Sequence, residues 1–123
     1  ASGSELSPRL IAEEAERGDH LALDLIMEMA RYLGATITTA VHVIDPAMVL
    51  LGGAMTFGRN ETQVGREFLH RVRQEFRGRT FTTIADKISI EYASLGGDAG
   101  FIGAAGCARR ALDIGRMPPE PHA

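Results

Sequence analysis

The stretch Asp45-Pro46-Ala47-Met48-Val49-Leu50-Leu51-Gly52-Gly53-Ala54 decides the fold, because a long helical pattern stops there and a strand begins. Proline cannot continue a helix, and it biases Asp45 toward extended geometry. The apolar run Met48 to Leu51 is short enough for a buried strand, and Gly52 and Gly53 then remove side chains at its end. In open α/β sheets ligands bind at the carboxyl ends of strands, so the glycines indicate either a ligand-lining turn or an ordinary tight turn.

Two helices are expected before this strand. Ser7 and Pro8 suit the N-cap and first position of a helix that runs to Gly18, and Asp19 can cap the next helix. That second helix, from about Asp19 to Val43, carries apolar residues at spacings of three or four: Leu23, Ile26, Ala30, Leu33, Ile37, Val41 and Ile44. We expect it to face the core, with close packing rather than solvent exposure around Gly34, Thr36, Thr38 and Thr39.

The chain after the strand predicts a helix, a strand and a last helix. Residues 56–60 read as a polar loop, Glu61 to Phe76 as an amphipathic helix ended by Gly78, and 79–85 as irregular. Residues 87–93 alternate like a half-exposed strand, and a second glycine-rich turn at 95–100 leads into a helix from Phe101 to Ile114. This order predicts a small α/β layer. Because two strands are marginal in water, we expect further chain or another subunit to complete the sheet.

Composition favours a single cytoplasmic domain. The 123 residues include 16 acidic and 13 basic side chains, and the arginines between Arg59 and Arg79 alternate with glutamates as on a solvated helix face, so we expect no nucleic-acid partner. The only cysteine, Cys107, lies in an apolar helical stretch where we expect it to pack as a small hydrophobe. No segment has the roughly 20 apolar residues of a membrane span, and no signal peptide is evident.

Chemistry-bearing motifs are few. The four histidines are scattered singly, so no metal site is predicted. Asp98 is interpreted either as the cap of the last helix or as a polar contact to a ligand or a metal-bound water. If the two strands are parallel, both glycine-rich turns lie at one edge of the sheet and form a cleft lined by main-chain N–H groups, which suits a nucleotide.

Several short motifs, in order and at family spacing, resemble the carboxyl-terminal part of the ROK family (repressor, open reading frame, kinase). The resemblance covers roughly residues 9 to 113 and rests on Gly18-Asp19, Ala22, Arg31-Tyr32-Leu33-Gly34, Asp45-Pro46, Val49 to Gly53, Ala93 to Gly96, Ala99-Gly100 and Gly103-Ala104-Ala105. It implies part of an actin-like ATPase (ribonuclease H-like) lobe, from a protein whose two α/β lobes close over ATP and a sugar.

The resemblance also implies a site. Gly52 and Gly53 correspond to the family's adenosine motif, and Ala54 and Met55 follow beside the nucleoside. The family's phosphate loop, catalytic aspartate, sugar-binding segment and zinc motif have no counterpart here. The expectation is therefore the carboxyl-terminal portion of a glucokinase-like hexose kinase that uses ATP and Mg²⁺, inactive alone and missing its amino-terminal lobe.

Two other interpretations remain open. The same lobe could sense sugar or hold the dimer in a ROK-type transcriptional repressor, or it could be a free-standing module that binds nucleotide or pairs with itself. A homo-oligomer is expected in either case. The domain organisation is expected to be a loop or cloning remnant at 1–6, the lobe segment at 7–115 and a disordered proline-rich tail at 116–123.

Overall fold

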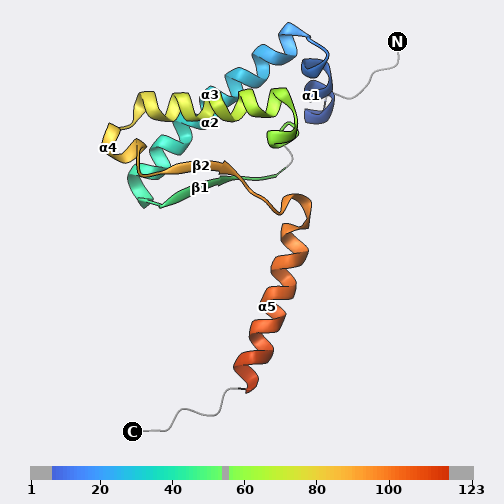
Figure 1. Ribbon diagram of the computed structural model, residues 1–123, viewed down its shortest axis with the longest axis vertical. Helices are drawn as coiled ribbons and strands as arrows, with labels where there is room; N and C mark the ends of the chain where they lie inside the picture. The colour runs from blue at the N-terminus through green and yellow to red at the C-terminus, as the bar shows by residue number, and fades with distance from the viewer. Residues whose placement is uncertain (1–6, 54–55, 117–123) are drawn as a thin grey trace. The chain divides into compact units, whose positions relative to one another are not determined.

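The computed structural model describes residues 7–53 and 56–116, which form two compact units with their boundary between Ala93 and Ser94. The first unit contains, in chain order, α1 (Pro8–Glu16), α2 (His20–Ile44), β1 (Met48–Leu51), a 3-10 helix (Arg59–Glu61), α3 (Gln63–Arg79), α4 (Thr82–Ala85) and β2 (Ser89–Tyr92) (Figure 1). The second contains a 3-10 helix (Gly96–Asp98) and α5 (Ala99–Arg116). The remnant predicted at 1–6 and the tail beyond Arg116 lie outside the described residues.

The predicted starts of the first two helices are confirmed. Ser7 caps α1 by accepting a 3.2 Å hydrogen bond from the Leu10 N–H, and Asp19 caps α2 with a 2.8 Å bond from the Ala22 N–H. The prediction for Asp45 is wrong, because this residue is left-handed (φ +50°) rather than extended. Its N–H donates to the Val41 carbonyl oxygen at 2.9 Å and closes the helix, a conformation that aspartate tolerates and that also avoids the clash with Pro46.

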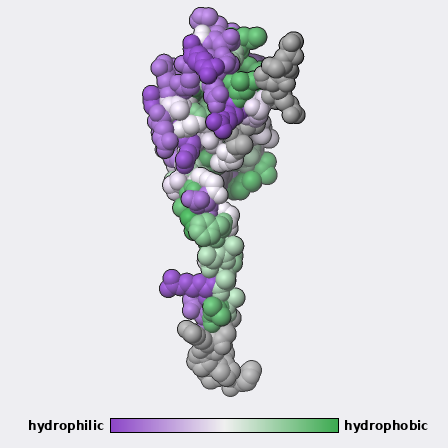
Figure 2. Space-filling model, turned by 90° about the vertical axis from the view of Figure 1, so that its right-hand side faces the viewer, coloured by the Kyte–Doolittle hydropathy of each residue, from purple (hydrophilic) through white to green (hydrophobic). Residues whose placement is uncertain are grey.

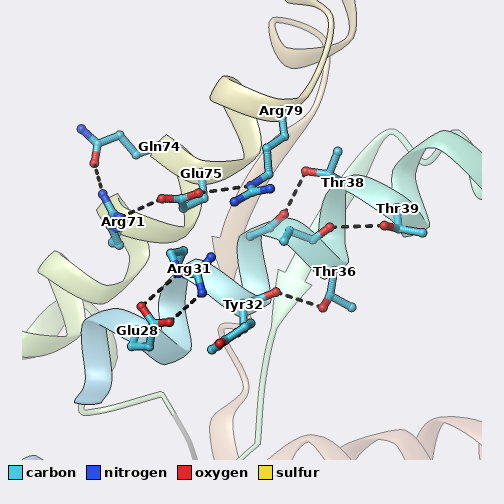
Figure 3. Close-up of polar contacts among 12 residues, drawn as sticks. Glu28, Arg31, Tyr32, Thr36, Thr38, Thr39, Arg71, Gln74, Glu75 and Arg79 are labelled. Atoms are coloured by element: carbon cyan, nitrogen blue, oxygen red, sulfur yellow. Dashed lines mark hydrogen bonds and ion pairs between the residues drawn. The ribbon is translucent and has the colours of Figure 1, made fainter. Parts of the chain in front are cut away.

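Helices α2 and α3 cross closely at Gly34, as predicted. A Cβ atom built on Gly34 would lie 2.8 Å from the carbonyl oxygen of Val72, so only glycine fits. Thr38 is buried beside this crossing and donates to the Gly34 carbonyl oxygen at 2.9 Å. Thr36 and Thr39 are exposed instead, and each donates to the carbonyl oxygen four residues earlier, so the expectation of packing is wrong for these two (Figure 3).

The core lies between these helices and the sheet. Its fully buried side chains come mainly from α2 and α3, and they include Ile26, Val41, Val72 and Phe76. Leu23 and Leu33 are half-buried at its margin. Ile44, the last residue of α2, is 70% exposed, contrary to prediction.

The two strands are parallel, with Met48 opposite Ser89 and Leu51 opposite Tyr92. Helices α2 and α3 lie on one side of this sheet (Figure 1), where Leu51, Ile90 and Tyr92 are buried. Met48 and Leu50 point to the other side and are 52% and 59% exposed. The prediction of a fully buried first strand is therefore wrong for one of its faces.

Local details after β1 also differ from expectation. Glu61 belongs to the 3-10 helix, and α3 begins at Gln63 because Thr62 caps it by accepting a 3.0 Å bond from the Gly65 N–H. Gly78 does not end α3, which continues to Arg79, and a short helix, α4, occupies part of the segment expected to be irregular.

The second unit consists of the glycine-rich turn and α5. The helix begins at Ala99, and Asp98 directly precedes it; no hydrogen bond from the Asp98 side chain is found in the described part of the chain. Cys107 is exposed, which corrects the expectation that it packs, and so are Phe101 and Leu112; Figure 2 shows mostly hydrophobic surface along this helix. Among the described residues no helix is long and apolar enough to cross a membrane.

Candidate functional site

Parallel pairing brings the ends of β1 and β2 to one edge of the sheet. The Ala93 N–H donates to the Leu51 carbonyl oxygen at 2.8 Å and carries the pairing one residue beyond β2. Gly52, the first residue after β1, therefore lies beside Ala93. The second glycine-rich turn belongs to the other unit, so the cleft between the two turns stays a prediction.

Gly52 and Gly53 are glycines for different reasons. Gly53 has a φ of +91°, a conformation that residues with side chains rarely adopt, although a Cβ there would meet no atom of the described residues within 4 Å. Gly52 lacks a positive φ, and its Cβ would meet only the Ala93 Cβ at 3.7 Å, an ordinary contact. The described part of the protein could therefore accept alanine at position 52, and the small residue leaves the main chain open to another molecule.

A cavity of about 360 Å³ adjoins Gly52. Most of its lining residues are apolar, Gly52 contributes only main chain, and Thr56 is the one residue with a hydroxyl group. The lining consists of Met29, Leu33, Leu50, Leu51, Gly52, Thr56 and Phe68. Cavities of this size and character bind small organic ligands. Of the predicted site residues, the structure thus places Gly52 on a cavity and Gly53 next to it, whereas Ala54 and Met55 lie outside the described residues.

The loop beyond the cavity contains a feature that sequence reasoning missed. Residues 56–60 were expected to form a polar loop, yet Phe57 is buried and its ring meets Phe68 edge to face, with centroids 4.9 Å apart. Phe57, Gly58 and Arg59 all have positive φ angles. A phenylalanine beside a glycine in an otherwise polar stretch was the signal that could have indicated an anchored turn.

Main-chain N–H groups at the start of α3 are hydrogen-bonded within the protein. The Val64 N–H donates to the Glu16 carboxylate at 2.8 Å, and the Gly65 N–H donates to Thr62. The Tyr92 hydroxyl donates to the Gly65 carbonyl oxygen at 2.8 Å, and burial raises the pKa of Tyr92 to about 12, although nearby Arg73 opposes the shift. Because the Val64 and Gly65 N–H groups already have acceptors, this helix end offers few free donors to a phosphate group.

The arginines of α3 are largely paired with carboxylates. Glu75 lies 2.8 Å from Arg71 and 3.2 Å from Arg79 (Figure 3). Arg73 lies 2.7 Å from Glu91 and also donates to the Ile90 carbonyl oxygen, beside an open groove of about 620 Å³ between α3 and β2. The partly exposed side chains of Arg71 and Arg79, paired with Glu75 of the same helix, fit the interpretation of a solvated helix face.

No candidate metal centre is formed by the part of the chain that the structure describes. It contains no group of three or more His, Cys, Asp or Glu side chains able to hold a metal ion. The Nδ1 atom of His42 lies 2.7 Å from the Thr38 carbonyl oxygen, which fits the interpretation of that histidine as a hydrogen-bonded residue.

Comparison with known proteins identifies the family. A profile of the ROK family matches residues 1–111. The chain belongs to the ROK family. Its relatives include a glucokinase from Halalkalibacterium halodurans (28% identical over 80% of this chain and 28% of the relative) and a glucokinase from Streptomyces coelicolor (30% identical, 80% of this chain, 30% of the relative). A xylose repressor from Caldicellulosiruptor bescii is 26% identical over 74% of this chain and 21% of that protein.

A solved structure shares the fold. The crystal structure described as a sugar kinase from Cytophaga hutchinsonii superposes with a TM-score of 0.72 at 30% identity, covering 88% of this chain and 34% of that one. This likeness confirms the predicted fold class, a partial actin-like ATPase lobe with a long core helix, short strands and flanking helices. This ROK-family chain spans about a third, or less, of the length of these relatives.

Proposed function

We propose that the chain is the carboxyl-terminal portion of an ATP-dependent hexose kinase, glucokinase-like, and that it supplies the adenosine part of the ATP site. The residues in contact with the nucleoside are Gly52, Gly53, Ala54 and Met55. The observation that carries the proposal is Gly52, which lines an apolar cavity at the carboxyl end of β1 and is not required to be glycine by its own packing. Similarity to two glucokinases supports the choice of reaction.

The contribution of this chain would be binding and orientation rather than proton or phosphoryl transfer. The apolar walls from α2, β1 and α3 take the base, and the Gly52 main chain can approach it closely. Phosphoryl transfer also needs a base, Mg²⁺ and a phosphate clamp held together. The described residues offer no carboxylate cluster for Mg²⁺. In this proposal the metal and the hexose are held by the rest of the kinase, so the chain is inactive alone.

A transcriptional repressor is the second candidate, favoured by the similarity to the xylose repressor. In that case the lobe senses a sugar or holds a dimer, and no phosphoryl transfer occurs. The sequence preceding these residues separates the two candidates. A kinase would show an Asp-x-Gly-x-Thr phosphate loop near its start, whereas a repressor would carry a helix-turn-helix ahead of the lobe.

The proposed partners follow from the exposed surface. Met48 and Leu50 form an uncovered apolar sheet face, and an isolated pair of strands is only marginally stable. In this proposal the amino-terminal lobe and the remaining strands of the kinase complete the sheet. A homo-oligomer, a cytoplasmic location and the absence of a nucleic-acid partner are part of the same proposal.

Alanine at Gly52 tests the site. The variant Gly52→Ala in the full-length protein should fold as stably as the wild type, because among the described residues its new methyl group meets only Ala93, at an ordinary contact distance. If the base lies against this main chain, the KM for ATP and the Kd for ADP, measured by calorimetry, should both rise, while the KM for the hexose is unchanged. Gly53 is less useful, since its positive φ would strain any substituted backbone.

The matched control is Gly78→Ala, which adds the same methyl group to open space on α3, far along the chain from the cavity. It should leave both nucleotide constants unchanged. Equal ADP binding by Gly52→Ala and wild type would remove Gly52 from the site. A wild-type protein that binds no adenine nucleotide at millimolar concentration would refute the kinase proposal and leave the repressor candidate.

A further inference from the structure

The turn at residues 57–59, ahead of α3, has an unusual backbone. Phe57, Gly58 and Arg59 have φ angles of +48°, +78° and +56° in succession. Two of these residues carry side chains, and such residues rarely adopt positive φ unless their surroundings hold them there. The contacts that impose this turn are therefore candidates for a functional role.

Thr62 contacts two of the residues around this turn, Phe57 and Gly58. Its hydroxyl donates to the Phe57 carbonyl oxygen and accepts a 3.0 Å hydrogen bond from the Gly65 N–H. Its methyl group packs under Gly58, where a Cβ atom would lie only 2.2 Å from the Thr62 Cγ2. One side chain thus fixes the turn from below and ties it to the first turn of α3.

The turn contacts two residues that line the cavity beside Gly52, namely Thr56 and Phe68. The Arg59 N–H donates to the Thr56 carbonyl oxygen at 2.7 Å, and Thr56 lines the cavity. The ring of Phe57 packs edge to face on Phe68, which lines it too. Thr62 itself is not part of the lining.

We infer that Thr62 is a positioning residue for the adenosine site: it holds the turn at 57–59, and through Thr56 and Phe68 it keeps the cavity beside Gly52 in the shape that receives the base. This inference rests on the proposed function. A preformed cavity spares the nucleotide the free energy of ordering the loop, so loss of the Thr62 contacts should weaken nucleotide binding although Thr62 does not touch the nucleotide.

Three substitutions of Thr62 in the full-length protein weaken the hydrogen bonds of its hydroxyl group to different degrees. Thr62→Ser keeps the hydroxyl, Thr62→Cys replaces it with a weak donor and acceptor, and Thr62→Val removes it at nearly constant size. We expect the Kd for ADP and the KM for ATP to rise about five- to twentyfold in Thr62→Val, to rise less in Thr62→Cys, and to rise least in Thr62→Ser, which keeps the hydroxyl and loses only the methyl contact with Gly58. The KM for the hexose and kcat at saturating ATP should change less than about twofold, because the change acts on nucleotide binding alone. If Thr62→Val does not fold, the comparison of Cys with Ser carries the test.

Thr38→Val is the matched control. Like the Thr62 variant, it removes a hydroxyl that donates to a main-chain carbonyl oxygen, but at the crossing of α2 and α3; the Thr38 hydroxyl is buried, whereas that of Thr62 is half-buried. Amide hydrogen exchange at Arg59, measured without nucleotide, supplies a readout independent of activity. Exchange at Arg59 should be faster in Thr62→Val and unchanged in Thr38→Val, because only the former frees the turn.

The outcomes separate this inference from the proposed function. Wild-type protein that binds no ADP overturns both. Wild-type binding together with unchanged ADP affinity in the hydroxyl-deficient Thr62 variants overturns the inference alone. Equal weakening by Thr38→Val and Thr62→Val would also overturn it, since the effect would then be a general loss of stability.

Discussion

The hydroxyl of Tyr92, at the end of β2, donates a 2.8 Å hydrogen bond to the carbonyl oxygen of Gly65 in the first turn of α3. Gly65 is itself pressed against the preceding turn, since a Cβ on it would lie 2.0 Å from the Arg59 carbonyl oxygen. The end of the strand, the start of the helix and the strained turn are thus joined within one small region. Its stability can be tested separately from nucleotide binding.

Titration of Tyr92 should appear in the pH dependence of stability. Burial raises the pKa of Tyr92 to about 12, against 10.0 for a free phenol. Between these values the folded chain retains a proton that the unfolded chain loses, so the free energy of unfolding falls as pH rises from about 10 to about 12. Urea unfolding of wild type and Tyr92→Phe across this range checks the prediction. Because other groups titrate in both proteins, the difference between them should shrink as pH rises, and a constant difference would contradict a buried phenol.

Gly34 should not tolerate even a methyl group. Alanine there would drive its Cβ to 2.6 Å from the Glu75 Cβ and 2.8 Å from the Val72 carbonyl oxygen, so α2 and α3 must separate. Overpacking of this kind destabilises proteins by about 1–3 kcal/mol, and we expect a loss of that size in urea unfolding of Gly34→Ala. Gly78→Ala, in open space on α3, should stabilise by up to about 1 kcal/mol instead. Equal effects from the two substitutions would mean that the helices do not meet at Gly34.

Arg73 should stabilise the packing of β2 against α3 through its contacts with Ile90 and Glu91. Its Nε donates to the Ile90 carbonyl oxygen at 2.9 Å while its guanidinium pairs with Glu91, so one side chain uses two groups on the strand. Arg73→Ala should lower the free energy of unfolding by about 0.5–1.5 kcal/mol, and Arg73→Lys should recover little because an ammonium lacks the planar fork. Arg77→Ala, at an exposed position one turn further along α3, is the control and should have less effect. Urea unfolding of all three variants makes the comparison, and full rescue by lysine would reduce the contact to a simple ion pair.

Much of the framework could be predicted because local chemistry dictates it. Ser7 and Asp19 are strong caps, the apolar spacing of α2 leaves one helical face, and alternation at 88–92 indicates a half-buried strand. Gly34 could be assigned to a close contact because glycine and the threonines near it are poor helix formers. Their presence inside a long helix therefore indicates that packing against a neighbour favours them there.

Other features depended on contacts between residues far apart in sequence. The Val64 N–H meets Glu16, 48 residues earlier, and no spacing rule links them. The apolar run of β1 could not reveal which face would be covered, since Met48 and Leu50 resemble Val49 and Leu51 in sequence. At the candidate site Gly52 could be selected by its place after the strand, whereas the role of Thr62 needs the positive φ angles that only the structure gives.

The carboxylate of Glu16 should act as a cap for a helix to which it does not belong. Glu16 is the last residue of α1 and accepts the Val64 N–H of α3 at 2.8 Å, so it satisfies a main-chain donor and places negative charge at the start of a helix. Glu16→Ala should therefore cost about 0.5–2 kcal/mol of stability, as loss of other cap residues does, while Glu16→Gln keeps an acceptor oxygen and should cost less. Glu13→Ala removes a carboxylate from the same helix whose partner, Arg9, is exposed, and should cost under about 1 kcal/mol. Urea unfolding of the three variants ranks their losses of stability. Of the two alanine variants, hydrogen exchange of the Val64 amide should accelerate only in Glu16→Ala. The same exchange rate in both would show that Glu16 does not hold this helix end.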